Sequence, residues 1–337
     1  MFLKKAFLCI VLCLGYFAAL SQDVPFSQQY ASRLYFNPAF AGLGHEWSVT
    51  LNHRTQWPAL NGAFVTNQLA GDLLLPNTKS AISLLVQQDK AGIGGLQKLT
   101  ASGGYAYHTP LTDKLGLSAG LQATVASLSI NYDNLVFGDQ LSDNGQIAVS
   151  SAEANTFEPA TYVSFTTGLL LYTDQLYLGF AAAHLNKPTY GFGEKTRLPV
   201  RFTANALYKF YVSQHRTRNG IAAISVSPAV AFTHQENFTR LDAGLYTNYA
   251  PLSLGLLYKG IPAAGGANQE QALAVIAGLQ LNQLSVAFSH DVGLTDFTRQ
   301  SGGANEISII FERLMIENVF RSRSQPKISN RFVWPAF

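Results

Sequence analysis

Charged residues are scarce in this chain: Asp, Glu, Lys and Arg make up 13% of 337 residues, about half the share of an ordinary soluble domain. The hydrophobic fraction is still 47%, with 22 Phe and 15 Tyr, so uncharged polar residues and glycine replace the missing charge. This composition excludes an intrinsically disordered chain. The lack of a long apolar run after the first twenty positions argues against a helical membrane protein. A net charge of +3 is too small to suggest a nucleic-acid partner.

Cysteine is confined to the first segment, residues 1–21, which has the pattern of a secretory signal peptide. Lys4 and Lys5 precede an apolar stretch that ends at small residues, and we expect cleavage after Ser21. Cys9 and Cys13 would be removed with it. The mature chain would then have no disulfide, no thiolate metal site and no catalytic cysteine.

Apolar and small polar residues alternate through most of the mature sequence. In residues 115–125 the odd positions are Leu, Ala or Val, and the even positions are Gly, Ser, Gln or Thr. This period of two predicts strands with one apolar and one polar face. The pattern gives fourteen candidate strands. Most of them are longer than the ~5–6 residues usual in globular proteins, and this length suits tilted membrane-spanning strands. They are 47–54, 64–74, 80–88, 98–108, 115–128, 160–172, 175–184, 200–212, 220–233, 240–249, 252–259, 271–281, 283–290 and 304–313.

The connections between these strands alternate in length. Those after even-numbered strands are short, whereas those after odd-numbered strands are mostly longer, with 234–239 as the exception. Short turns on one side and long loops on the other are typical of an outer-membrane barrel. We therefore predict an all-β fold, a transmembrane antiparallel β-barrel of about 14 strands at 47–314. Its short turns would face the periplasm and its longer loops the exterior, and both termini would lie on the periplasmic side.

Motifs that could carry chemistry do not fit their structural context. Gly116-Leu117-Ser118-Ala119-Gly120 matches the G-x-S-x-G nucleophile elbow, which needs a turn from strand to helix, but it lies in the middle of a predicted strand. The seven histidines are scattered. His290 and Asp291 are neighbours, and adjacent strand residues point to opposite faces. We predict no catalytic residues, no metal site and no cofactor, and hence no enzyme.

Two segments lie outside the predicted barrel. Residues 22–46 are rich in aromatics and contain the turn signal Asn37-Pro38, and they are expected either to plug the lumen or to lie in the periplasm. Residues 315–337 form a basic tail that ends in aromatics. This tail is expected to contact a periplasmic partner or to anchor at the inner, periplasmic interface of the outer membrane, with a loose extension as the alternative.

Several blocks resemble the PorP/SprF family, outer-membrane proteins of the type IX secretion system in Bacteroidota. The resemblance is carried by QDVPFSQQY at 22–30, YFNPAFAG at 35–42, LNHRTQWP at 51–58, YAYH at 105–108 and GGANEIS at 302–308. Asn305 stands where the family usually has His. The candidate family-motif and partner positions are Phe26, Ser27, Gln28, Asn37, Pro38, Gly42, Arg54, Gln56 and Trp57.

The resemblance implies a non-enzymatic barrel of the secretion and gliding machinery that supports export or surface anchoring of a large adhesin. Implied partners are outer-membrane lipid, a secreted surface adhesin with a C-terminal secretion domain, and periplasmic ring or motor components. A channel or transporter for hydrophobic or small solutes is the alternative, since a barrel of this size can also conduct. An outer-membrane hydrolase is disfavoured because no triad is placed.

Overall fold

The computed structural model describes residues 23–314, apart from 93–94, 132–134, 142–150, 152–158, 193–195, 218–219 and 262–270. The expected signal peptide and the basic tail lie outside the described residues.

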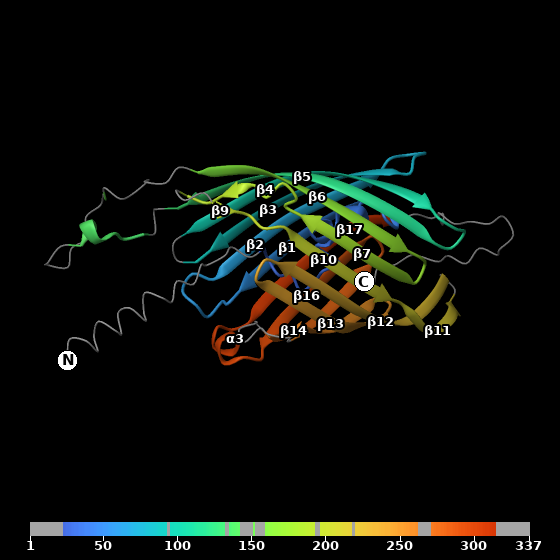
Figure 1. Ribbon diagram of the computed structural model, residues 1–337. Helices are drawn as coiled ribbons and strands as arrows, with labels where there is room; N and C mark the ends of the chain where they lie inside the picture. Colours follow the sequence, from blue (N-terminus) through green and yellow to red (C-terminus); the bar gives the residue numbers. More distant parts are fainter. Residues whose placement is uncertain are drawn as a thin grey trace.

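The described chain forms a closed antiparallel β-barrel (Figure 1). Fifteen strands share one sheet, and β10 and β11 both pair with β12 as two halves of one barrel strand, so the ring has fourteen. β17 pairs with β1 and closes the ring. The strands are β1 His45–Gln56, β2 Phe64–Leu74, β3 Ser80–Ala91, β4 Leu96–Pro110, β5 Gly116–Ile130, β6 Ala160–Tyr172, β7 Leu176–Ala183, β10 Arg201–Tyr208, β11 Phe210–Thr217, β12 Gly220–Gln235, β13 Phe238–Tyr249, β14 Leu252–Ile261, β15 Ala272–Leu281, β16 Leu284–Gly293 and β17 Ala304–Leu314.

All fourteen predicted strands are confirmed, two of them, β2 and β6, with the predicted bounds. The break at Lys209 between β10 and β11 was not predicted, and neither was the small hairpin of β8 (Thr189–Tyr190) and β9 (Thr196–Arg197) in the connection after β7. Four short helices complete the described chain: α2 Arg33–Phe36, η1 Pro38–Phe40, η3 Gly138–Gln140 and α3 Asp296–Gln300. Within the described ranges, no helix is long and apolar enough to cross a membrane.

The barrel carries its apolar side chains on the outside. On β5, Leu121 is 64% exposed, whereas Ser118, three residues earlier and on the other face, is fully buried. The same alternation recurs around the ring, so Gly, Ser, Thr and Gln line the interior and Leu, Val, Ile and Phe cover the outer wall. An apolar outer wall with a polar interior is the arrangement of a barrel surrounded by lipid.

The two ends of the barrel differ. The connections 75–79, 111–115, 173–175, 250–251 and 282–283 make a short-turn end, and the connections 57–63, 131–159, 184–200 and 294–303 belong to the opposite, long-loop end. Two connections at the long-loop end are also short, at 92–95 and 236–237, because the flanking strands extend further than expected. The first residue of β1, His45, pairs with Leu314 at the end of β17, so the barrel wall begins and ends at the short-turn end.

Candidate functional site: an N-terminal segment inside the barrel

Residues 23–44, called the lumen segment here, lie inside the barrel. The sequence left open whether they would plug the lumen or lie in the periplasm. In the structure, Phe26, Ala39, Phe40 and Ala41 are almost fully buried. The segment hydrogen-bonds to side-chain or backbone groups of β1, β2, β4–β7, β10, β14, β16 and β17.

Ser27 and Gln28 are fixed by two carboxylates on the last strands. The Glu306 carboxylate accepts the backbone N–H groups of Ser27 at 2.8 Å and Gln28 at 3.1 Å. The Ser27 hydroxyl donates to Asp291 at 2.7 Å. The Gln28 side-chain amide donates to the Glu306 carbonyl at 2.9 Å and to Ser289 at 3.1 Å. A carboxylate that accepts successive backbone N–H groups makes strong, directional bonds, so this part of the segment has one defined position.

Two cations neutralise these carboxylates. Arg54 on β1 donates to Asp291 at 2.9 Å and to Glu306 at 3.1 Å. The ammonium of Lys259 on β14 donates to Asp291 at 2.6 Å and also contacts the Ser27 hydroxyl. These four charged side chains, called the four-charge cluster here, are all buried. Buried charges are tolerated only when they are paired and hydrogen-bonded, and here two positive and two negative groups enclose Ser27.

A second charged group holds the segment near the short-turn end. The Asp72 carboxylate on β2 accepts the Gly42 N–H at 2.6 Å and lies 3.2 Å from the Arg33 guanidinium. His45 and Ser48, the inward-facing residues that begin β1, contact the same carboxylate. Gly42 has a φ of +70°, and a Cβ there would meet the side chain of Ala81. This position therefore favours glycine for both conformation and space.

The turn at Asn37-Pro38-Ala39 packs against strand positions that lack side chains. Asn37 donates to the carbonyls of Leu169 at 3.0 Å and Phe180 at 3.3 Å. A Cβ on Gly120 would collide with the Ala39 backbone, and one on Gly168 would collide with the Asn37 side chain. The Ser118 hydroxyl donates to the Ala39 carbonyl at 2.7 Å. The G-x-S-x-G stretch on β5 is therefore a docking surface for this turn.

Asp23, the first described residue, lies at the long-loop end. Its carboxylate is 2.9 Å from Arg201, 3.0 Å from His184 and 3.3 Å from Lys98, each at a strand end that adjoins a long-loop-end connection. Burial alone would raise the pKa of Asp23, but the charges of these partners hold it well below its ordinary value. We expected both termini at the short-turn end. That expectation does not hold for Asp23, because the segment runs back through the lumen before β1 begins.

The predicted positions fall into two groups. Phe26, Ser27, Gln28, Asn37, Pro38 and Gly42 belong to the lumen segment, and Arg54 binds it directly. Gln56 and Trp57 lie apart, at the end of β1. The Trp57 ring stacks edge-on against Phe64 and Phe297, with centroids 5.0 and 5.1 Å away. The structure thus brings together seven of these nine positions and separates the remaining two.

Sequence reasoning missed the acidic partners Asp72, Asp291 and Glu306 as well as Lys259 and Arg201. Glu306 was noticed only as part of a resembling block. A usable signal was present, because each is a charged residue at an inward position in or directly after a predicted strand. In a chain with so little charge, such positions need buried partners.

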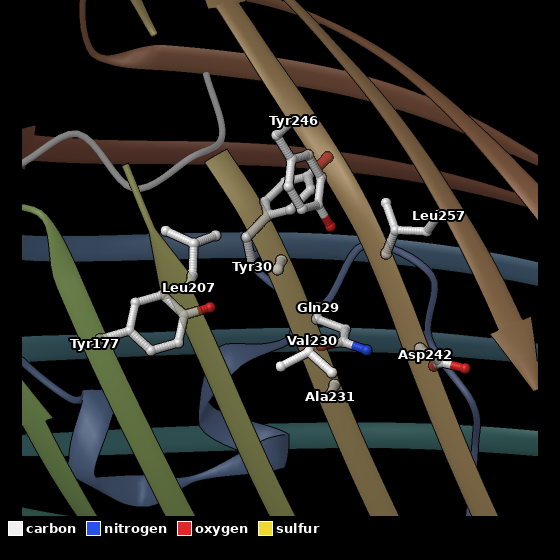
Figure 2. Close-up of a pocket in the computed structure, with 10 residues that line it drawn as sticks. Gln29, Tyr30, Tyr177, Leu207, Val230, Ala231, Asp242, Tyr246 and Leu257 are labelled. Carbon is white, nitrogen blue, oxygen red and sulfur yellow. The ribbon is translucent and has the colours of Figure 1, made fainter. Parts of the chain in front are cut away.

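A cavity of about 10 Å³ lies beside Tyr30, between Tyr177 and Tyr246 on the barrel wall (Figure 2). That is room for about one water molecule. The Tyr30 and Tyr246 rings meet edge to face with centroids 6.1 Å apart.

The neighbours His290 and Asp291 do not face each other in the structure. Asp291 points inward to the four-charge cluster, whereas its neighbour His290 points outward and bonds Asn305 at 2.8 Å. No group of three or more His, Cys, Asp or Glu side chains in the described ranges is placed to hold a metal ion. What the site does is hold one segment of the chain inside the barrel.

The sequence matches the model of one protein family. The model described as "Type IX secretion system membrane protein PorP/SprF" matches residues 18–311. No curated relative matches.

Solved structures with a similar fold include three barrels. The toluene transporter TbuX of Ralstonia pickettii is 13% identical, with a TM-score of 0.48 over 85% of this chain and 94% of that one. Omp33 of Acinetobacter baumannii is 8% identical, with a TM-score of 0.46 over 80% of this chain and 99% of that one. A FadL homologue of Pseudomonas aeruginosa is 11% identical, with a TM-score of 0.45 over 84% of this chain and 94% of that one.

Proposed function

Because the chain belongs to the PorP/SprF family of type IX secretion system membrane proteins, we propose that this outer-membrane β-barrel supports export or surface anchoring of a large adhesin-type cargo. The cargo would carry a C-terminal secretion domain and would bind the connections at the long-loop end. Long loops of outer-membrane barrels face the exterior, and a protein held at the cell surface can reach only that side.

The observation that carries this proposal is the occupied lumen. Two buried charged groups and a glycine-lined docking surface hold residues 23–44 inside the ring, and the cavity beside Tyr30 has room for about one water. A large protein has no path through such an interior while the segment is in place. The barrel therefore acts as a rigid support beside the export route, and the cargo does not travel through it.

The short-turn end is where we place the periplasmic partners. Its turns are short, and the first strand begins and the last strand ends there, which makes a firm surface for ring or motor components of the secretion system. The apolar outer wall binds outer-membrane lipid.

We propose that the barrel is not an enzyme. Ser118, in the stretch that matches a nucleophile elbow, is fully buried and donates to the Ala39 carbonyl. A fluorophosphonate probe, which labels activated serines, is expected to leave the protein unmodified. Labelling that disappears in Ser118→Ala would contradict this part of the proposal.

Affinity purification from native outer membranes tests the partner assignment. We expect the tagged barrel to retain a surface protein with a C-terminal secretion domain, or periplasmic ring or motor components. A matched control is an unrelated outer-membrane barrel carrying the same tag and expressed at the same level. Recovery of the barrel alone, under conditions that preserve a known membrane complex, would contradict the assignment.

A further inference from the structure

Polar side chains interrupt the apolar outer wall across a group of neighbouring strands. The outward-facing positions of five adjacent strands, β16, β17, β1, β2 and β3, carry Asn and His side chains with a Thr and a Gln. His53 and Asn67 are exposed, and His290 and Asn305 are partly exposed. We call this group the wall patch; its members are Thr55, His53, Asn67, Gln88, His290 and Asn305.

Hydrogen bonds fix the imidazoles of the wall patch. His53 Nδ1 lies 2.7 Å from the Asn67 side-chain oxygen, and His290 Nδ1 lies 2.8 Å from that of Asn305. An amide oxygen only accepts, so each Nδ1 carries the proton and donates. Nε2 of a neutral ring is then an acceptor, which for His53 lies 3.2 Å from the Thr55 hydroxyl. Each Asn amide nitrogen has two further N–H donors, so the patch can both donate and accept outward.

The wall patch lies within the apolar band rather than beyond it. Towards the short-turn end it is followed by Leu51, Phe288 and Ile307, which are 50, 51 and 43% exposed. Towards the long-loop end, the Trp57 aromatic cluster lies above His53, and Val292, 45% exposed, follows His290. Aromatic clusters of this kind mark the membrane interface. In hydrocarbon there is no water for these groups to bond.

A groove opens beside the patch on the same wall. It has a volume of about 550 Å³ and is lined by Leu51, His53, Asn67, Leu69, Val86 and Leu99 among others. A two-fold contact centred on the groove would set groove against groove and leave a void. A different, convex partner would fill it.

We propose that the wall patch and its groove bind a second membrane-embedded protein that presents uncharged hydrogen-bonding side chains to His53 and Asn67. An acyl chain could fill the groove but offers no hydrogen bond. A lipid phosphate calls for Arg or Lys, and neither residue type is a member of the wall patch. Side-chain hydrogen bonds are among the interactions that hold membrane segments together where the hydrophobic effect does not. This inference is independent of the cargo, because it concerns the lipid-facing wall.

Photo-crosslinking in the native outer membrane tests the proposal. p-Benzoylphenylalanine replaces Leu69 at the groove, or Leu121 on β5 as the matched outward control. We expect a discrete protein adduct from position 69, with a partner that stays in the membrane after urea extraction, and lipid adducts alone from position 121. In His53→Leu/Asn67→Leu the position-69 adduct should fall about tenfold.

Three outcomes would overturn it. These are an adduct of twice the barrel's mass, lipid adducts alone at position 69, and a protein adduct that persists undiminished in the double variant. The first two readings use an otherwise unaltered barrel and so do not depend on folding of the double variant, which heat-modifiable migration checks separately. Adhesin secretion is assayed apart from crosslinking, so failure here and failure of the proposed cargo role are distinguishable.

Discussion

The Glu306 carboxylate on the last strand of the barrel accepts the backbone N–H of Ser27, 279 residues earlier in the chain, at 2.8 Å. This bond joins the lumen segment to the strand that closes the ring. Docking of the segment and closure of the barrel therefore depend on the same buried groups.

Replacing Glu306 by Gln tests this dependence. The change removes one of two negative charges from the four-charge cluster and leaves an unbalanced buried cation, so we expect a loss of about 3–5 kcal/mol of unfolding free energy. Glu46→Gln is the control, because Glu46 forms an exposed pair with Arg313 at 3.0 Å, and exposed pairs contribute about 1 kcal/mol or less. Urea unfolding of the refolded barrel in liposomes gives both values. Equal shifts for the two variants would contradict the account.

Gly120→Val is expected to displace the Asn37-Pro38-Ala39 turn. A Cβ at Gly120 would meet the Ala39 backbone, whereas at Gly103 on the outer wall it would meet nothing within 4 Å. Both substitutions put the same β-branched residue into a strand, so Gly103→Val is the matched control. Hydrogen exchange followed by mass spectrometry should show faster exchange at residues 36–42 in Gly120→Val alone. Unchanged protection there would show that the glycine is not a docking position.

The strands could be predicted from the sequence, because alternation is a local signal and one face of each strand must meet lipid. The course of the lumen segment could not. Asp23 and Arg201 are 178 residues apart, and no periodicity connects an irregular segment with the strand positions that receive it. The motif residues Ser27 and Arg54 were found through the family resemblance, but their partner Asp291 was found only once the ring had closed. Gly120 illustrates the same limit: its spacing suggested a nucleophile elbow, and only packing shows that it makes room for Ala39.

The ion pairs of the Asp23 carboxylate make the stability of the docked lumen segment depend on pH. Its folded-state pKa lies well below the ordinary value, so its stabilisation is complete above the unfolded pKa of about 3.9 and is lost as pH falls through the folded value. The contribution of Asp23 to the stability of the docked segment should therefore stay constant from about pH 8 to pH 5. Asp23→Asn should lower the urea midpoint at pH 7, and the difference from the natural chain should shrink below about pH 4. A difference that grows on acidification would contradict the assignment.

The orientation of the barrel can be read by labelling single cysteines, since the expected mature chain has none. Leu60, in the β1–β2 connection, and Thr78, in the β2–β3 turn, are both exposed. With the long-loop end outside, a membrane-impermeant maleimide should label Leu60→Cys on intact cells and Thr78→Cys only after the outer membrane is permeabilised. The reverse pattern would overturn the orientation on which the placement of cargo and periplasmic partners rests.

The central claim is that a barrel with an occupied lumen serves secretion and does not conduct solutes. Its most direct test is a strain that lacks this chain, in which adhesin at the cell surface and uptake of a hydrophobic solute are measured side by side and compared with the complemented strain. We predict that the surface adhesin is lost and restored by complementation, while uptake is unchanged. Normal surface adhesin together with lost uptake would contradict the account.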